Sequence, residues 1–336
     1  TSKLLNEIEN REPSDDFRVS IPDEVFQEYL IEIGVAVLNG TVLYGDIKNI
    51  TRINCSHDLK IGESSYSSFL EETWENEGLI QSLEGISFFK NLTELYCEGN
   101  SIVDLNISKN TKLKILSCGR NQLKYLDVSK NTNLITLCCD YNQLTNLDVS
   151  KNSNITELIC SKNELKTLDI SQNINLTELE CGLNPLTTLD LSQNTNLTYL
   201  GCHSNQLTMI DVSQNRNLTH LFCSNNHLKT LNVSKNYNLS YLHCDSNQLI
   251  KLDVSENKKL EALYCSGNLL KTLEISENSY LKRLHCAKNE LITLDVSKNV
   301  NLFFIGCYNN RLTSLNVKNN QRLFALSCYD NRLEHL

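Results

Sequence analysis

Apolar residues recur along most of this chain with a period of 21 residues. The unit from Leu113 to Asn133 shows the pattern of apolar and polar positions in the order LKILSCGRNQLKYLDVSKNTN. Its cysteine returns at the same spacing without a slip, at Cys97, Cys118, Cys139, Cys160, Cys181, Cys202, Cys223, Cys244, Cys265, Cys286, Cys307 and Cys328. An asparagine stands three residues after each of them. A fixed period of this length indicates a solenoid, in which each unit stacks on its neighbours.

Each unit predicts one short strand followed by a return made of turns. In the L-x-x-L-x-C segment, the leucines and the cysteine point inward and the residues between them point outward. Twelve such strands, paired in parallel about 4.8 Å apart, make a ribbon on the order of 55 Å long. The asparagine after the strand can donate to and accept from the backbone of adjacent turns, at about 1 kcal/mol net per bond. The return, L-D-V-S-x-N, turns back through serine and asparagine, whose side chains are expected to satisfy their own local backbone.

The repeated L-x-x-L-x-C-x-x-N-x-L resembles the leucine-rich repeat, and residues 92–336 as a whole are similar to the bacterial extracellular internalins that carry a cysteine ladder. This resemblance implies an α/β-type solenoid: a leucine-rich-repeat horseshoe of 21-residue repeats, with a parallel β-sheet on the concave face and a small helical N-terminal cap. It also implies an extracellular or cell-surface anchored protein that binds another protein. The step from fold to role is one of analogy.

The fourteen cysteines raise the question of disulfides, and their spacing argues against them. Neighbouring residues in register on parallel strands hold their Cβ atoms about 4.8 Å apart, whereas a disulfide needs about 3.8 Å. Each buried thiol is expected to keep its proton and to pack as a small hydrophobe. A straight row also lacks the convergence that tetrahedral zinc ligation needs. Cys138 differs because it points outward beside Cys139; it predicts an incidental exposed thiol, with a mixed disulfide to a partner as the alternative.

The chain divides into a flexible tether, an N-terminal cap, degenerate first repeats and twelve regular leucine-rich repeats, at residues 1–19, 20–49, 50–91 and 92–336. The degenerate part is identified by Ile50, Ile53 and Cys55, which repeat the strand pattern two periods before Cys97. Leu336 ends the twelfth repeat without a capping unit, which a solenoid needs for solubility. Removed chain, an associating subunit or a frayed last turn would each account for this.

The cap is expected to begin with a helix from Ser20 to Ile33. Ser20 and Asp23 resemble a capping pair, Pro22 falls in the first turn, and Gly34 follows the end. The apolar face of this helix comprises Val25, Phe26, Tyr29, Leu30 and Ile33.

Two further local signals belong to this N-terminal region. Asn39 and Gly40 separate two apolar runs and predict a β-hairpin, with too few carboxylates nearby for calcium. An insertion at 60–78 contains a capping box at Ser68 and Glu71 and predicts a helix. This helix is expected to cover the first turn as part of the cap; the alternative is a docking element for a partner.

Aromatic and histidine residues gather at the outward strand positions of the later repeats. The predicted partner-binding residues are Tyr199, His203, His220, Phe222, Tyr241, His243, Tyr264, His285, Phe304 and Tyr308. Earlier repeats carry ordinary solvated residues there, among them Glu157 and Glu180. Rings with one polar tip are what binding hot spots use, so these residues predict a ligand surface. The alternative is that they pack across strands and stabilise the sheet.

No metal, cofactor or catalytic site is predicted. His243 and His285 fall two strands apart, about 9.6 Å by the strand spacing, which is too far to share an ion. Serines occupy fixed turn positions in nearly every unit, and none stands out with a convergent base. If the histidines tune a contact, binding is expected to change as pH falls through about 6.5.

Net charge limits the partners further. The chain carries a net charge of −9, without the basic patch that nucleic acid requires, and no apolar run is long enough to span a bilayer. The sequence therefore predicts a non-enzymatic surface or secreted recognition protein that binds a protein through the concave strand face, in adhesion or in host or cell interaction. The alternative is a carbohydrate-binding module in which Phe222, Tyr241 and Tyr264 stack on sugar rings.

Overall fold

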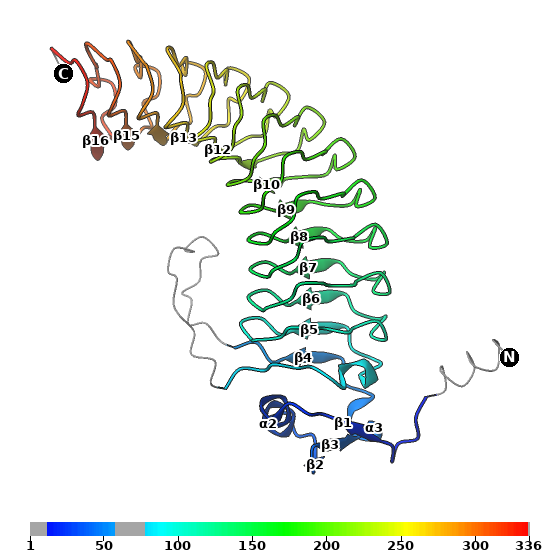
Figure 1. Ribbon diagram of the computed structural model, residues 1–336. Helices are drawn as coiled ribbons and strands as arrows, with labels where there is room; N and C mark the ends of the chain where they lie inside the picture. Colours follow the sequence, from blue (N-terminus) through cyan, green and yellow to red (C-terminus); the bar gives the residue numbers. More distant parts are fainter. Residues whose placement is uncertain (1–11, 58–77, 335–336) are drawn as a thin grey trace. The chain divides into compact units, whose positions relative to one another are not determined.

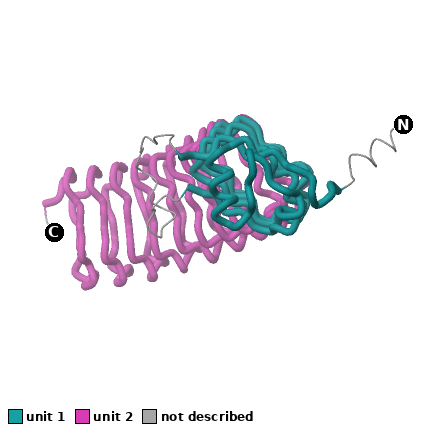
Figure 2. Tube along the Cα trace, turned by 90° about the horizontal axis from the view of Figure 1, so that it is seen from below, with its two compact units in different colours: residues 1–144 teal, residues 145–336 magenta. Residues whose placement is uncertain are grey.

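The computed structural model describes residues 12–57 and 78–334 (Figure 1). The chain forms two compact units, Thr1–Leu144 and Thr145–Leu336, drawn in teal and magenta in Figure 2. The helix predicted within 60–78, most of the predicted tether and the terminal Leu336 lie outside the described residues. Within the described ranges, no helix has the length and apolar character needed to cross a membrane.

The first unit opens with a small antiparallel sheet. Strand β3 (Thr41–Leu43) pairs on one side with β1 (Arg18–Ser20) and on the other with β2 (Val37–Leu38). Asn39 and Gly40 join β2 to β3, and their φ angles of 51° and 69° are those of a two-residue hairpin turn. The predicted hairpin is therefore confirmed. Helix α3 (Tyr44–Ile47) follows directly, with both Tyr44 and Ile47 buried.

The predicted N-terminal helix is present but starts later than expected. Helix α2 spans Glu24–Glu32, and its N-cap is Asp23, whose carboxylate accepts a hydrogen bond from the backbone N–H of Phe26 at 2.9 Å. The residues from Arg18 to Ser20, expected in the tether and at the helix start, instead form β1, where Val19 is buried between two exposed neighbours. The expected apolar face is also narrower, because Ile33 remains 44% exposed.

The second carboxylate oxygen of Asp23 fixes this helix to the first repeats. It accepts hydrogen bonds from the backbone N–H groups of Gln81 and Ser82, at 2.7 and 2.9 Å. Gly85, which precedes the 3-10 helix η1 (Ile86–Phe88), has a φ of 94°. A Cβ atom at Gly85 would lie 2.6 Å from the carbonyl oxygen of Ser20, so only glycine fits this close approach.

The repeats of the first unit begin at β4 (Arg52–Asn54). It pairs in parallel with β5 (Glu94–Tyr96), and β6 (Ile115–Ser117) and β7 (Thr136–Cys138) continue the order. Ile53 lies opposite Leu95 although two repeat lengths separate them in sequence. Strand β4 thus places Ile53 in register with the repeat that begins at β5.

The described part of the second unit contains nine parallel strands in sequence order. They are β8 (Glu157–Ile159), β9 (Glu178–Glu180), β10 (Tyr199–Gly201), β11 (His220–Phe222), β12 (Tyr241–His243), β13 (Ala262–Tyr264), β14 (Arg283–His285), β15 (Phe304–Gly306) and β16 (Ala325–Ser327). Each central apolar residue lies opposite its counterpart 21 residues away, as Leu221 does opposite Leu242. These strands, like β5 to β7, follow the predicted 21-residue register; turns, rather than helices, make up their return segments.

The cysteines form the expected buried row of thiols. All fourteen lie within the described residues, and none of them is in a disulfide. From Cys97 to Cys307, each inward cysteine is fully buried. Burial disfavours the thiolate and raises the pKa of Cys223 to about 12, so these thiols are protonated and unreactive in the folded protein.

The predicted asparagine ladder is confirmed in detail. The side-chain nitrogen of Asn226 donates to the carbonyl oxygens of Cys202 and Cys223, at 3.0 and 3.1 Å. Its side-chain oxygen accepts from the backbone N–H of Leu207 at 3.0 Å. One side chain thus connects the backbones of two successive turns.

A second asparagine ladder corrects the expectation for the return segment. The local turn there is closed by the residue after the leucine, an aspartate or an asparagine: Asp211 accepts from the N–H of Ser213 at 2.9 Å, and Asn232 accepts from the N–H of Ser234 at 3.1 Å. The asparagine that follows, Asn236, is completely buried and donates to the carbonyls of Val212 and Asn215 in the preceding turn, at 3.0 and 2.9 Å. The return segments are therefore joined from repeat to repeat, as the strands are.

Candidate partner-binding face

Eight rings in the second unit form one connected set, which we call the aromatic row. It consists of Tyr199, His220, Phe222, Tyr241, His243, Tyr264, His285 and Phe304, on strands β10 to β15. Strand register produces it, because each strand places its first and third residues outward and leaves the central one in the core. Every member is half-buried.

The rings stack upon one another. The centroid of Tyr264 lies 4.0 Å from that of His243 and 4.5 Å from that of His285, with interplanar angles of 29° and 16°. His220 and Tyr241 stack in the neighbouring column at 4.7 Å and 6°. Parallel strands about 4.8 Å apart bring flat side chains in register to this contact distance.

Phe304, the last ring of the row, comes from a different strand position than the ring it contacts. Phe304 occupies the first position of β15, yet its ring lies 4.3 Å from that of His285, which occupies the third position of β14. The residue opposite His285 is Gly306, and a Cβ atom there would lie 3.2 Å from Cε1 of Phe304. Glycine therefore leaves the space that Phe304 fills.

The histidines of the row are neutral at physiological pH. Desolvation by burial lowers the pKa of His243 to about 4, with smaller contributions from the nearby His285 and His220. Burial also lowers the pKa of His220 and of His285. The row consequently presents an uncharged surface of rings with polar tips.

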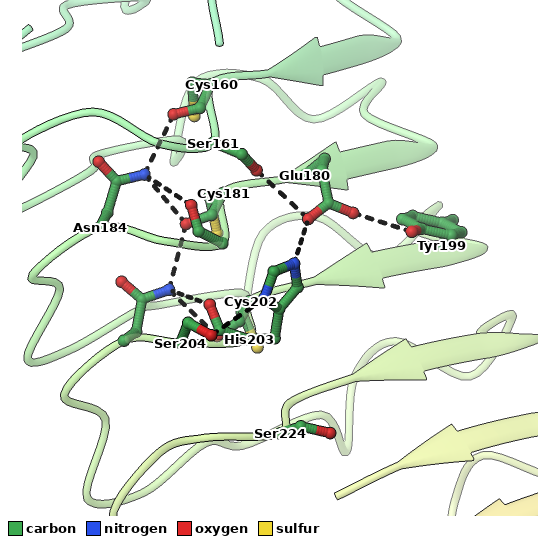
Figure 3. Close-up of polar contacts among 12 residues, drawn as sticks. Cys160, Ser161, Glu180, Cys181, Asn184, Tyr199, Cys202, His203, Ser204 and Ser224 are labelled. Atoms are coloured by element: carbon green, nitrogen blue, oxygen red, sulfur yellow. Dashed lines mark hydrogen bonds and ion pairs between the residues drawn. The ribbon is translucent and has the colours of Figure 1, made fainter. Parts of the chain in front are cut away.

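Two of the ten predicted residues lie outside the aromatic row. Tyr308 follows β15 and stacks on Tyr329 at 4.7 Å, as a separate pair. His203 follows β10 and places its Nε2 3.5 Å from Oε1 of Glu180 (Figure 3).

Glu180 is the residue that sequence reasoning missed. Its Oε2 accepts a hydrogen bond from the hydroxyl of Tyr199 at 2.8 Å, and its Oε1 accepts from the hydroxyl of Ser161 at 3.3 Å (Figure 3). The carboxylate also covers Gly201, where an added Cβ atom would overlap it. Glu180 is thus a fixed polar end of the row. The signal available in the sequence was the glycine that stands one repeat later at the same position.

The row does not bring ligands together around one metal ion. Tyr264 lies between His243 and His285 in strand register. Within the two described ranges, no three histidine, cysteine or acidic side chains converge as metal ligands.

Comparisons with known proteins identify similar solved structures. No family model matches the chain, and no curated protein does. Among solved structures, the functional domain of InlJ from Listeria monocytogenes, which includes a cysteine ladder, is 31% identical, with a TM-score of 0.83; the match covers 96% of this chain and 73% of that domain.

Two more distant structures share the fold. The internalin InlF of Listeria monocytogenes has 20% identity and a TM-score of 0.69, over 94% of this chain and 95% of that one. The leucine-rich-repeat ectodomain of the receptor kinase GASSHO1/SCHENGEN3 from Arabidopsis thaliana has 25% identity and a TM-score of 0.62, over 74% of this chain and 36% of that one. The buried thiol row, the 21-residue register and the likeness to InlJ together show that this chain belongs to the leucine-rich-repeat proteins of the internalin type that carry a cysteine ladder.

Proposed function

We propose that this chain is a non-enzymatic recognition protein that binds a protein partner through the aromatic row, at the cell surface or outside the cell. The role is one of adhesion or of host or cell interaction. Eight half-buried rings in mutual contact form a continuous surface that a partner can cover. Clusters of this composition supply most of the affinity in protein interfaces.

The observation that carries the proposal is the stacking of the rings upon one another. A sugar stacks on an open ring face, but both faces of Tyr264 are occupied, by His243 and by His285. The row offers ring edges, imidazole nitrogens and phenol hydroxyls instead, a mixture that suits apolar and hydrogen-bonding groups of a protein surface. This disfavours the carbohydrate alternative.

The likeness to known proteins supports the same role. The match to the functional domain of InlJ, a protein of the internalin type, covers 96% of this chain. The GASSHO1/SCHENGEN3 ectodomain was solved in complex with CASPARIAN STRIP INTEGRITY FACTOR 2, so a leucine-rich-repeat solenoid of similar build holds a partner.

Site-specific photo-crosslinking tests the proposal. A photoreactive phenylalanine analogue replaces Phe222 in the row or, as a control, Tyr237, which is 46% exposed outside the strands. We expect that only the variant with the photoreactive residue at position 222 becomes crosslinked to a specific protein on intact cells that the chain meets in its natural setting. The captured partner, once purified, should bind the Phe222→Ala/Tyr264→Ala double variant at least tenfold more weakly than the unmodified chain.

A glycan array probed with the unmodified chain and with the Phe222→Ala/Tyr264→Ala variant tests the carbohydrate alternative. Selective binding of a glycan by the unmodified chain, lost in the folded double variant, would replace the protein partner with a carbohydrate. Retention of the strand signal in circular dichroism establishes that the double variant is folded.

A further inference from the structure

Two charges of opposite sign flank the part of the aromatic row that lies on strands β10 to β13. Glu178 on β9 is directly opposite Tyr199 in strand register, and Arg283 on β14 is directly opposite Phe304. Both charged residues occupy the first position of their strands, in one column, and both are exposed. On the four strands between them, the outward positions hold only aromatic residues, neutral histidines, one glycine and one alanine.

Both charges remain accessible to a partner. In the part of the chain that the structure describes, Glu178 and Arg283 form no ion pair. The guanidinium of Arg283 makes a cation–π contact with the ring of Phe303, 4.9 Å from its centroid.

Other charges beside the row do have partners. Lys282 pairs with Glu261 at 2.8 Å. Asp245 accepts a hydrogen bond from the backbone N–H of Ser266 at 2.8 Å, and burial raises the pKa of its carboxyl group. Glu178 at one end and Arg283 at the other are therefore exposed charges of opposite sign that a partner lying across these strands can meet.

The separation of the two charges fits a short extended peptide. From β9 to β14 there are five strand intervals, which amount to about 24 Å. An extended chain advances about 3.4 Å per residue, so about seven residues cover this distance.

We propose that the row binds an extended segment of a protein in which a lysine or arginine and an aspartate or glutamate stand about seven residues apart, with apolar or aromatic residues between them. The cation meets Glu178 and the carboxylate meets Arg283, so the segment crosses strands β9 to β14 in one direction. This inference rests on the proposed function and specifies the partner's charge order.

Three synthetic dodecapeptides test the charge order. They share one central sequence of tyrosine, leucine and serine and differ at two positions seven residues apart, which hold lysine and glutamate, two lysines, or two glutamates. Fluorescence anisotropy at low ionic strength should show that the unmodified chain prefers the lysine–glutamate peptide by about threefold to fivefold, the effect of one exposed ion pair. The preference should shrink with added salt.

Charge reversal should change the preference in a defined way. Arg283→Glu leaves two negative ends and should prefer the peptide with two lysines, whereas Glu178→Lys should prefer the one with two glutamates. The matched controls are Arg216→Glu and Glu274→Lys, which change net charge equally at exposed positions outside the strands. Both controls should keep the preference of the unmodified chain.

Equal binding of the three peptides, absence of binding included, would overturn the charge order, and so would equal shifts in the controls. The Phe222→Ala/Tyr264→Ala variant separates this failure from that of the proposed function. If that variant weakens all three peptides alike, the row still binds protein segments and only the charge order is wrong. If it changes nothing, the proposed function fails as well.

Discussion

The imidazole of His243 lies 4.0 Å from the ring of Tyr264 and 4.6 Å from the ring of Phe222, so aromatic side chains enclose it on two sides. This enclosure removes water from the imidazole and lowers its pKa to about 4. A change in binding near pH 6.5, expected from an ordinary histidine, therefore moves to more acid conditions for this residue.

The same shift makes stability depend on pH. The folded chain keeps His243 neutral down to pH about 4, whereas the unfolded chain protonates it near pH 6.5. The stabilising contribution is complete above pH 6.5 and is lost progressively as pH falls towards 4. Between pH 7 and 4.5, the melting temperature of the unmodified chain should therefore fall more than that of His243→Phe. Differential scanning calorimetry of the two proteins measures this difference.

The control for this pH dependence is His227→Phe, a substitution at an exposed histidine outside the strands. It should follow the unmodified chain across the whole range. Parallel curves for all three proteins would contradict the enclosed, neutral state of His243.

The second asparagine ladder predicts a large loss at one buried position. Asn215 donates to the carbonyls of Leu191 and Asn194 at 3.1 and 2.8 Å and is fully buried. Asn215→Ala removes two buried hydrogen bonds and leaves a small cavity, while a backbone N–H still donates to each carbonyl, so it should cost about 1–3 kcal/mol of unfolding free energy. Asn217→Ala, at an exposed asparagine of the same turn, should cost less than about 0.5 kcal/mol. Similar denaturation midpoints for the two variants would show that the ladder contributes little.

A left-handed residue after each strand allows a stabilising substitution. Leu183 has a φ of 54°, a conformation that is unfavourable for leucine and readily adopted by asparagine. The equivalent residue two repeats later is Asn225, with a φ of 53°. Leu183→Asn should raise the unfolding free energy by about 0.5–1 kcal/mol, and Asn225→Leu should lower it by a similar amount. Urea denaturation measures both, and changes of the same sign would refute the argument.

The contact between Gly201 and Glu180 predicts a coupled pair. An alanine at position 201 would displace the Glu180 carboxylate and break its hydrogen bond with Tyr199, at a cost of about 1–2 kcal/mol. In a Glu180→Ala background the obstacle is gone, so Gly201→Ala should cost much less there. A double-mutant cycle measures this coupling. Equal costs in the two backgrounds would mean that the glycine serves another purpose.

The strands, the thiol row and the members of the aromatic row were predictable because the period does not vary. A fixed 21-residue interval assigns each residue to one outward or inward position, so the sequence alone predicts that Phe222, His243 and Tyr264 lie side by side. The second asparagine ladder was equally periodic, but its residue type is also typical of local turns, and that explanation was preferred.

The sequence does not predict in which direction an outward side chain leans along the sheet surface. Phe304 leans over Gly306 of its own strand, and Glu180 leans over Gly201 of the next repeat, because a glycine leaves space in both places. Such choices depend on rotamers and on the size of neighbours, which a strand pattern does not encode. The start of α2 was missed for a related reason: Ser20 and Asp23 are both good N-caps, and the pairing of β1 decides between them.

The buried thiols make local opening of the solenoid measurable turn by turn. Each turn from Cys97 to Cys307 carries one inward thiol that is inert while its neighbours cover it. A cysteine-specific reagent followed by peptide mass spectrometry would therefore give a separate opening rate for every turn of the array. The buried cysteines thus provide one probe in each turn for where and how fast this chain opens locally.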